Sequence, residues 1–315
     1  MVERTPLVSV VIPTFNGAHL LPACLDSLQR QSYAGLEVIV ADGASTDATS
    51  DVLRRYTQVR HLRLRKNAGF TGNVNAGLRA AHGDVVCLLN NDAQADQHWI
   101  TACVDALAGA TEAGSVASKV LFQDGVTINS AGDVLSRDGT ARQRGAGQPD
   151  GPEWGRREPV FGAMGGAAAY RRAMLADVGL LDEAFFMYLE DVDLALRAQL
   201  RGWSCVYEPA ARVYHVGSAT GGGPLASFYN GRNLIRLWAK NLPTGLIPRL
   251  WPALVAFQRQ RALEALRAWR GEAARATLRG QLVGFAQLPT VLAARSAVQH
   301  RRRISDAQLY SLLAP

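Results

Sequence analysis

A short apolar run that ends abruptly in polar residues, Val85-Val-Cys-Leu-Leu-Asn-Asn-Asp92, indicates the kind of fold this chain adopts. A run of this length and composition, bounded by turn-forming residues, predicts a buried strand. Leu7-Val-Ser-Val-Val-Ile12, which Pro13 ends, has the same character and predicts another buried strand. Packing in a core does not explain a carboxylate placed directly after such a strand. Asp92 is therefore the first candidate functional residue.

Helical and strand patterns alternate around these two runs. Helical patterns occupy residues 20–30, 47–56 and 73–81, and further strand-like runs occupy residues 37–41 and 61–64. This alternation predicts βαβ units and an α/β fold with a mainly parallel central sheet. Ligands of such sheets bind beyond the carboxyl ends of the strands. The polar clusters fall at those ends: Thr14-Phe15-Asn16, Asp42, Asn67 and Asn90-Asn91-Asp92.

The composition indicates an ordinary globular protein. The 315 residues suffice for one large α/β domain with an extension, and 48% of them are apolar. The four cysteines lack the spacing of a disulfide framework or a zinc site, which fits a reducing cytoplasm. The first residues do not resemble a signal peptide. The longest uncharged stretch of the tail, residues 280–294, contains a proline and is too short to span a bilayer.

The charge is unevenly distributed along the chain. Residues 1–225 carry 20 Lys and Arg against 24 Asp and Glu, whereas residues 226–315 carry 14 against 3. A basic tail on an acidic body indicates either contact with an anionic surface or a solvated helical face. The charge pattern alone leaves both interpretations open.

The cluster Asn90-Asn91-Asp92 also has two interpretations. Mg²⁺ and Mn²⁺ prefer carboxylate and other oxygen ligands and complete their shells with water and phosphate oxygens. The same three residues favour an ordinary turn. His215 follows strand-like runs at residues 204–207 and 212–214. A lone histidine beside apolar residues is more often structural than a metal ligand.

A second group of carboxylates follows an aromatic run, in Phe185-Phe-Met-Tyr-Leu-Glu-Asp-Val-Asp193. Leucines at helical spacing predict a helix that begins here. Asp193 precedes Arg197 by four residues, so we expect a surface-type pair worth about 0.5 kcal/mol. Helix capping does not require both Glu190 and Asp191. A carboxylate between apolar walls can have its proton affinity tuned for general-base catalysis.

Six segments in register resemble the family 2 glycosyltransferases with a GT-A fold, in particular the rhamnosyltransferase-like bacterial branch that builds O-antigens and other cell-envelope polysaccharides. Together they cover about residues 7–240. The segments are Val10-Val-Ile-Pro-Thr-Phe-Asn16, Ala41-Asp-Gly-Ala-Ser-Thr-Asp47, Asn67-Ala-Gly-Phe70 with Asn75 and Gly77, Leu88-Leu-Asn-Asn-Asp92, Gly162-Ala-Met-Gly-Gly166 and Tyr188-Leu-Glu-Asp-Val-Asp193.

The resemblance implies a role for each matching residue. Asn90-Asn91-Asp92 corresponds to the family's Asp-x-Asp motif, with Asp92 binding Mg²⁺ or Mn²⁺ on the donor diphosphate and an asparagine in place of the first aspartate. His215 matches a histidine that completes the metal site in some members. Asp191 corresponds to the catalytic base, and Glu190 to its neighbour at the acceptor site. The residues implied in nucleotide-sugar binding are Pro13, Thr14, Asn16, Asp42, Asn67, Asn75, Asn90, Asn91, Gly165 and Arg232.

The resemblance also implies an activity and a domain arrangement. It implies inverting transfer of a sugar from dTDP-rhamnose or a UDP-hexose to a saccharide acceptor that is lipid-linked. Residues 1–240 would form the catalytic domain, with residues 1–120 binding the nucleotide sugar and residues 121–240 the acceptor. Residues 241–315 would form a basic amphipathic helical tail. For this tail the resemblance favours binding to an anionic membrane, on the inner face of the cell membrane.

Two other classes of protein fit the sequence less well. A sugar nucleotidyltransferase would favour a glycine-rich basic loop after the first strand, where Pro13-Thr-Phe-Asn16 stands instead. A non-catalytic nucleotide-sugar-binding or nucleic-acid-binding module would have no use for the Glu190-Asp191 pair. The basic tail also lacks a recognisable nucleic-acid reading motif, so we expect no nucleic-acid partner.

Overall fold

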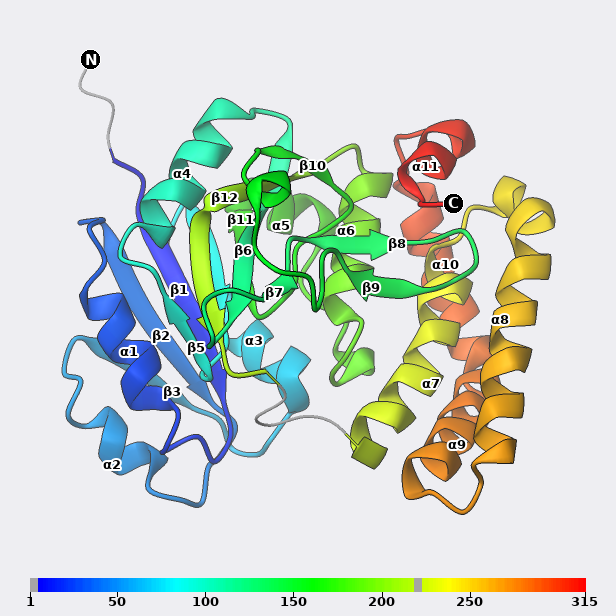
Figure 1. Ribbon diagram of the computed structural model, residues 1–315, viewed down its shortest axis with the longest axis horizontal. Helices are drawn as coiled ribbons and strands as arrows, with labels where there is room; N and C mark the ends of the chain where they lie inside the picture. The colour runs from blue at the N-terminus through cyan, green and yellow to red at the C-terminus, as the bar shows by residue number, and fades with distance from the viewer. Residues whose placement is uncertain (1–4, 218–222) are drawn as a thin grey trace.

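A mixed β-sheet forms the centre of the computed structural model, which describes residues 5–217 and 223–315. The strand order is β10-β12-β6-β11-β4-β1-β2-β3 (Figure 1). β1 (Val8–Thr14) lies between β4 (Val85–Leu89) and β2 (Leu36–Asp42) and runs parallel to both. β3 (Val59–Arg63) extends this parallel half of the sheet. The predicted α/β class and the parallel arrangement of these four strands are confirmed.

Helices cover both faces of the parallel half. They are α1 (Leu21–Gln29), α2 (Thr49–Leu53), α3 (Gly69–Ala80) and α4 (Trp99–Gly109). Alternate residues of β1 face opposite sides of the sheet. Val10 packs in the cluster that holds Trp99 of α4, and Val11 packs in the cluster that holds Val74 of α3. The second predicted helix is shorter than expected, and the third begins four residues earlier, at Gly69, which has a positive φ of 74°.

The other half of the sheet mixes strand directions. β11 (Ala167–Arg171) runs antiparallel to both β4 and β6 (Ala113–Phe122), and β12 (Ser204–His215) runs parallel to β6. The two runs predicted at 204–207 and 212–214 form one strand with a bulge. β5 (Ala93–Ala95), β7 (Ile128–Ser130) and β10 (Glu158–Val160) pair at the margins. β8 (Asp133–Leu135) and β9 (Ala141–Gln143) form a separate hairpin.

Three short elements, η1 (Pro152–Trp154), α5 (Arg172–Val178) and η2 (Glu183–Phe185), precede α6 (Glu190–Leu200). Beyond β12 the described chain is helical. It forms α7 (Gly223–Asn241), η3 (Thr244–Leu246), α8 (Ile247–Arg267), α9 (Glu272–Ala286), α10 (Leu288–His300) and α11 (Asp306–Leu312), which lie at one end of the sheet (Figure 1). None of the helices in the described ranges is long and apolar enough to cross a membrane.

The C-terminal helices share a hydrophobic core with the rest of the molecule. Leu135 of β8 and Leu196 of α6 are buried in one cluster with Trp238 of α7 and Leu309 of α11. α7 and α9 also approach closely, because a Cβ added to Gly280 would lie only 2.1 Å from the carbonyl oxygen of Phe228. These helices are therefore an integral part of the folded structure.

Candidate active site

A cavity of about 610 Å³ lies beyond the carboxyl end of β4. Its walls include six of the residues that the sequence singled out: Asn90, Asp92, Gly165, Glu190, Asp191 and His215. They come from four separate parts of the chain, which the sheet and α6 bring together. The cavity therefore joins the candidate metal ligands to the candidate catalytic carboxylates.

The candidate metal ligands face each other across the junction of β5 and β12. The pairing of His215 with Ala93 places the histidine next to Asp92, with His215 Nε2 3.1 Å from Asp92 Oδ1. The other ring nitrogen, Nδ1, lies 3.0 Å from Oδ1 of Asn129. If Nδ1 donates to that oxygen, Nε2 carries no proton, and two acceptors then face each other. A divalent cation bound to both would remove this conflict, as would a proton on both nitrogens.

This donor set fits a metal that shares its shell with substrate. A carboxylate oxygen and an imidazole nitrogen both suit Mn²⁺, and Mg²⁺ and Mn²⁺ commonly retain water and bind phosphate oxygens. Within residues 5–217 and 223–315, no group of three or more His, Cys, Asp and Glu side chains is placed to hold a metal ion. Asn129, which orients His215, was missed in the sequence because it lies in a segment with weak periodicity.

Asp191 is the second residue of α6, and two backbone N–H groups hold its carboxylate. Its Oδ2 accepts a hydrogen bond of 2.9 Å from the N–H of Gly165, and its Oδ1 accepts one of 2.8 Å from Val192. A Cβ at Gly165 would lie 3.2 Å from the Asp191 Cβ, so a side chain there would crowd the carboxylate. Burial raises the pKa of Asp191, and the N–H of Gly165 lowers it only in part. A raised pKa suits a general base.

Two further buried carboxyl groups surround Asp191. Burial raises the pKa of Glu190 well above its usual range, and Asp191 raises it further. Burial also raises the pKa of Asp133 well above its usual range, and the charge of Asp191 raises it further. Neither oxygen of Asp133 accepts a hydrogen bond of ordinary geometry from the described residues. The sequence did not single out Asp133, because it follows a glycine in a segment that reads as a loop.

The backbone just before α6 adopts an unusual conformation. Phe186, Tyr188 and Leu189 all have positive φ angles, of 66°, 65° and 68°, although none of them is glycine. Such conformations cost about 1–3 kcal/mol each and persist only where the surroundings enforce them. This strained loop ends directly before the Glu190-Asp191 pair, so its conformation fixes where α6 and its carboxylates begin.

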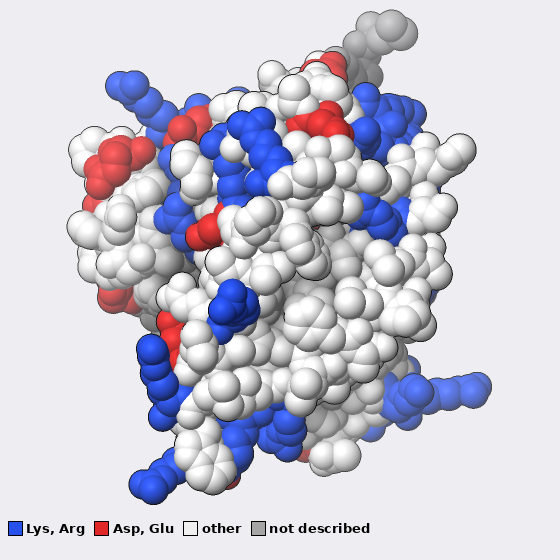
Figure 2. Space-filling view, turned by 90° about the vertical axis from the view of Figure 1, so that its right-hand side faces the viewer, with Lys and Arg blue, Asp and Glu red and all other residues white. Residues whose placement is uncertain are grey.

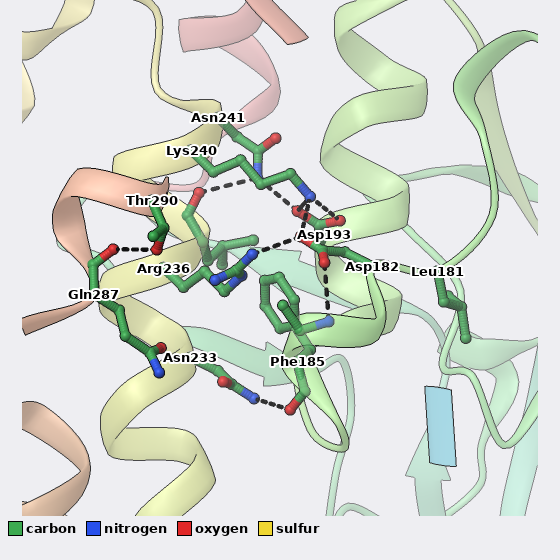
Figure 3. Close-up of polar contacts among 12 residues, drawn as sticks. Leu181, Asp182, Phe185, Asp193, Asn233, Arg236, Lys240, Asn241, Gln287 and Thr290 are labelled. Atoms are coloured by element: carbon green, nitrogen blue, oxygen red, sulfur yellow. Dashed lines mark hydrogen bonds and ion pairs between the residues drawn. The ribbon is translucent and has the colours of Figure 1, made fainter. Parts of the chain in front are cut away.

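Two residues of α7 hold the strained loop in place. The side-chain amide of Asn233 donates a hydrogen bond of 3.1 Å to the carbonyl oxygen of Phe185 (Figure 3). It also donates to the carbonyl oxygens of Met187 and Tyr188, at 2.9 and 2.8 Å. Arg232 donates to the carbonyl of Phe185 at 2.7 Å. Arg232 was predicted to bind the nucleotide sugar, but its guanidinium contacts protein backbone and does not line the cavity.

Asp193 has a different environment from the one expected. The prediction of a surface-type pair is wrong, because Asp193 is fully buried. It accepts hydrogen bonds from Lys240 at 2.9 Å and from Asn241 at 2.8 Å (Figure 3). It also accepts one from Arg197 at 2.8 Å. Burial alone would raise the pKa of Asp193, but Lys240 and Arg197 lower it well below its usual range. The sequence pattern of one helix could not reveal partners from α7.

Of the residues predicted to bind the nucleotide sugar, Asn90 and Gly165 line this cavity and the others do not. The amide of Asn91 donates to Thr14 Oγ1 at 2.8 Å, and Asp42 accepts from Ser45, His61 and Arg63. Asn75 donates to the carbonyl of Leu181 and therefore supports the loop before α6. The roles in nucleotide-sugar binding stay predictions for the whole set: Pro13, Thr14, Asn16, Asp42, Asn67, Asn75, Asn90, Asn91, Gly165 and Arg232.

Comparison with known proteins identifies the family. The model of Glycosyl transferase family 2 matches residues 9–179. Over 245 residues the chain is 33% identical to the N-acetylglucosaminyl-diphospho-decaprenol L-rhamnosyltransferase of Mycobacterium tuberculosis, a match that covers 70% of this chain and 80% of the relative. Two further relatives are 30% identical over 70% of the chain: the uncharacterized protein y4gI of Sinorhizobium fredii and the O-antigen biosynthesis protein RfbC of Myxococcus xanthus.

The chain spans 25% of y4gI and 18% of RfbC, so it matches only one segment of those longer proteins. Its fold is similar to that of a solved mannosyltransferase from Pyrobaculum calidifontis, in complex with GDP-Man and Mn²⁺, with a TM-score of 0.57 and 20% identity over 98% of this chain and 84% of that one. The sheet and its helical layers therefore have the GT-A arrangement. The chain belongs to glycosyl transferase family 2.

Proposed function

We propose that this glycosyltransferase is a metal-dependent inverting enzyme that transfers a sugar from a nucleoside diphosphate to a saccharide carried on a lipid diphosphate. The observation that carries the proposal is the meeting of Asp191 with Asp92 and His215 in one cavity. The name of the mycobacterial relative supports both an L-rhamnosyl donor and a diphospho-lipid acceptor. dTDP-rhamnose is therefore the first donor to test, with UDP-hexoses as the alternatives, in a cell-envelope pathway.

Asp191 accepts the proton of the acceptor hydroxyl as that oxygen attacks the anomeric carbon of the donor. The bond to the nucleoside diphosphate breaks on the opposite side, so the anomeric configuration inverts. Burial raises the pKa of Glu190 well above its usual range, and in its protonated form this carboxyl can donate a hydrogen bond to another acceptor oxygen. Asp92 and His215 would hold Mg²⁺ or Mn²⁺, which when bound neutralises negative charge on the leaving diphosphate.

The nucleotide is proposed to bind at the carboxyl ends of β1, β2 and β4. This assigns residues 1–120 to the nucleotide sugar and residues 121–240 to the acceptor, with residues 241–315 as the membrane-facing tail. Thr14 and Asn91 support this arrangement, because both lie at strand ends near Asp92 and are hydrogen-bonded to each other.

Replacement of the base tests the proposal most directly. Asp191→Asn keeps the shape of the side chain but removes its basicity, so turnover should fall by roughly 10²-fold or more while donor affinity changes little. Because the pKa of Asp191 is raised, wild-type turnover should be lost on acidification at a pH above the usual aspartate range. Steady-state kinetics with dTDP-rhamnose over a pH series measures both. Asp105→Asn, on the exposed side of α4, is the matched control. Unchanged turnover in Asp191→Asn would remove the base from this position.

Metal dependence has its own test. Asp92→Ala should abolish the part of nucleoside diphosphate binding that requires Mn²⁺, because the variant lacks the carboxylate ligand. Isothermal titration calorimetry with dTDP or UDP, once with Mn²⁺ and once with a chelator, measures the affinity of the wild type and of Asp92→Ala. Equal affinity in all four titrations would contradict the metal assignment.

A further inference from the structure

A second cavity, of about 420 Å³, adjoins the active site, and Ala141 and Asn230 line both cavities. One face of α7 forms its first wall, with residues at successive helical turns. Phe257 and Arg261, one turn apart on α8, form the opposite wall, and the tip of the β8–β9 hairpin closes one side. The full set of lining residues is Thr140, Ala141, Gly223, Ala226, Ser227, Asn230, Leu234, Phe257 and Arg261. The cavity therefore extends the active site toward α8.

Arg261 is the charged residue in this lining, and its guanidinium lies beside an aromatic ring. None of the described residues forms a hydrogen bond or ion pair with its guanidinium, whose closest aromatic neighbour is Phe257, with the ring centroid 5.8 Å away. Glu264 lies one turn further along α8, but its carboxylate accepts a hydrogen bond from Gln260. Burial lowers the pKa of Arg261, and the negative charge of Glu264 offsets only part of this effect. A partly buried, unpaired guanidinium is costly unless a ligand supplies an anion.

The rest of the lining fits an anion joined to an apolar chain. Ser227 and Asn230 provide neutral hydrogen-bond donors, and none of the described lining residues is acidic. Leu234 and Phe257 provide apolar surface beside them. Further out on α8, Leu263 and Leu266 are exposed. Figure 2 shows this end of the molecule as a broad uncharged area with Lys and Arg around its margins.

We propose that the second cavity binds the diphosphate of a prenyl-diphospho-saccharide acceptor, with Arg261 as its principal cation. This inference rests on the proposed function, because it divides one acceptor between two cavities. The saccharide lies in the first cavity near Asp191, the diphosphate meets Arg261, and the prenyl chain leaves over α8. Guanidinium groups bind phosphate oxygens in a bidentate manner, which suits a diphosphate better than a neutral glycoside.

Direct binding tests the subsite without requiring turnover. The probe is geranylgeranyl diphosphate in detergent, titrated against the full chain. Arg261→Gln should raise its Kd by roughly 10-fold or more, as expected for a lost charge-assisted hydrogen bond. Arg261→Lys, which keeps the charge, should have a Kd between those of the wild type and Arg261→Gln. Arg259→Gln, an exposed arginine on the same helix, is the matched control and should leave Kd unchanged.

Kinetics then connects the subsite to the reaction. Arg261→Gln should raise KM for a prenyl-diphospho-saccharide by a similar factor, while KM for an octyl glycoside of the same saccharide and for the donor stays the same. An unchanged Kd in Arg261→Gln, or equal weakening in Arg259→Gln, would overturn the subsite. Loss of binding to phosphatidylglycerol vesicles without any change in acceptor KM would assign Arg261 to the membrane instead. A wild-type enzyme that binds the probe through Arg261 but glycosylates neither acceptor would contradict the proposed function and not the subsite.

Discussion

Asp191 and Asp193 stand two residues apart on the same helix, and their environments give them opposite chemistry. Among the described residues Asp191 accepts hydrogen bonds from backbone N–H groups alone and has a raised pKa, whereas Asp193 is held between Lys240 and Arg197 and has a lowered pKa. Two carboxylates whose pKa values are driven apart take different roles. Asp191 therefore remains available to accept a proton, and Asp193 serves as a permanent buried anion that joins α6 to α7.

The corrected environment of Asp193 changes its expected effect on stability. Asp193→Asn removes a buried charge, leaves Arg197 without its carboxylate partner and leaves Lys240 with Asp182 alone, which should lower the free energy of unfolding by about 3–5 kcal/mol. Urea unfolding at pH 7 measures this loss. The same titration on Asp105→Asn should differ from the wild type by no more than about 0.5 kcal/mol, as is usual for an exposed side chain. A loss of that small size in Asp193→Asn would restore the surface-type interpretation.

At the residue scale the sequence predicted the parts of the site that follow from strand ends. Asp92 and His215 each come at the end of an apolar strand, and the structure places them 3.1 Å apart. Asn129 and Asp133 could not be found in this way, because both lie among short irregular strands without a hydrophobic period. Lys240 was also missed as a partner, since no local pattern links residues 47 positions apart.

At the scale of secondary-structure elements, α7 positions the loop and the helix that carry the catalytic carboxylates. Figure 3 shows Asn233, Arg236, Lys240 and Asn241 directed from α7 toward the turn at Phe185 and the start of α6. The contacts fall into two groups, backbone clamping by Asn233 and charge pairing by Lys240. Because one rigid helix makes both, the strained loop and the first turn of α6 are held as one unit.

Asn233 is therefore a positioning residue for Asp191. Asn233→Ala removes the three hydrogen bonds that maintain the positive φ angles, so the loop should relax and the carboxylate should shift. We expect kcat to fall by roughly 10-fold or more while KM for the nucleotide sugar changes little, because a small misplacement of a catalytic group has a large kinetic effect. Steady-state kinetics on folded protein measures this difference.

The matched control for Asn233→Ala is Gln281→Ala. Gln281 is also a buried amide, and it donates hydrogen bonds of 2.9 Å to Gln258, between α9 and α8. Its loss should reduce stability without changing kcat. A similar fall in kcat in both variants would mean that Asn233 has only a structural role.

The predicted elements were most accurate where one pattern extends over a whole strand or helix. The strand at residues 85–89 was predicted with its observed bounds, since its apolar run is framed by polar residues at both ends. The segment 123–157 carries no such pattern in its sequence, and its strands β7, β8 and β9 have only three residues each. Tertiary contacts, including the bridge between Ser136 and Ala314, determine its conformation.

At the scale of the whole molecule, basic and apolar side chains gather on the C-terminal helices. Trp251 and Trp269 are 57% and 60% exposed, and other large apolar side chains exposed nearby are Leu263, Leu266, Leu282, Phe285 and Leu292. Figure 2 shows arginines and lysines at the margins of this area. Aromatic side chains beside cations are typical of surfaces that lie in the headgroup region of anionic membranes.

Truncation after Asn241 would not isolate this surface. Leu237 and Trp238 of α7 share a buried cluster with Leu250, Leu254 and Leu309, so removing the helices beyond α7 would expose the core next to α6. A truncated chain could then bind vesicles through its uncovered core. Substitutions on the outside of the intact protein test membrane binding more cleanly.

We expect the full-length protein to bind phosphatidylglycerol vesicles through the exposed tryptophans. Trp251→Gln with Trp269→Gln should weaken binding by roughly 10-fold or more, since burying one large apolar side chain is worth about 1.5–3 kcal/mol. Sedimentation with vesicles measures the affinity, and Val126→Gln, which changes an exposed apolar residue outside the C-terminal helices, is the control. Raising the salt concentration should also weaken binding, because mobile ions screen exposed arginines from anionic headgroups. Salt-independent binding that both tryptophan substitutions leave intact would show that this surface does not face the membrane.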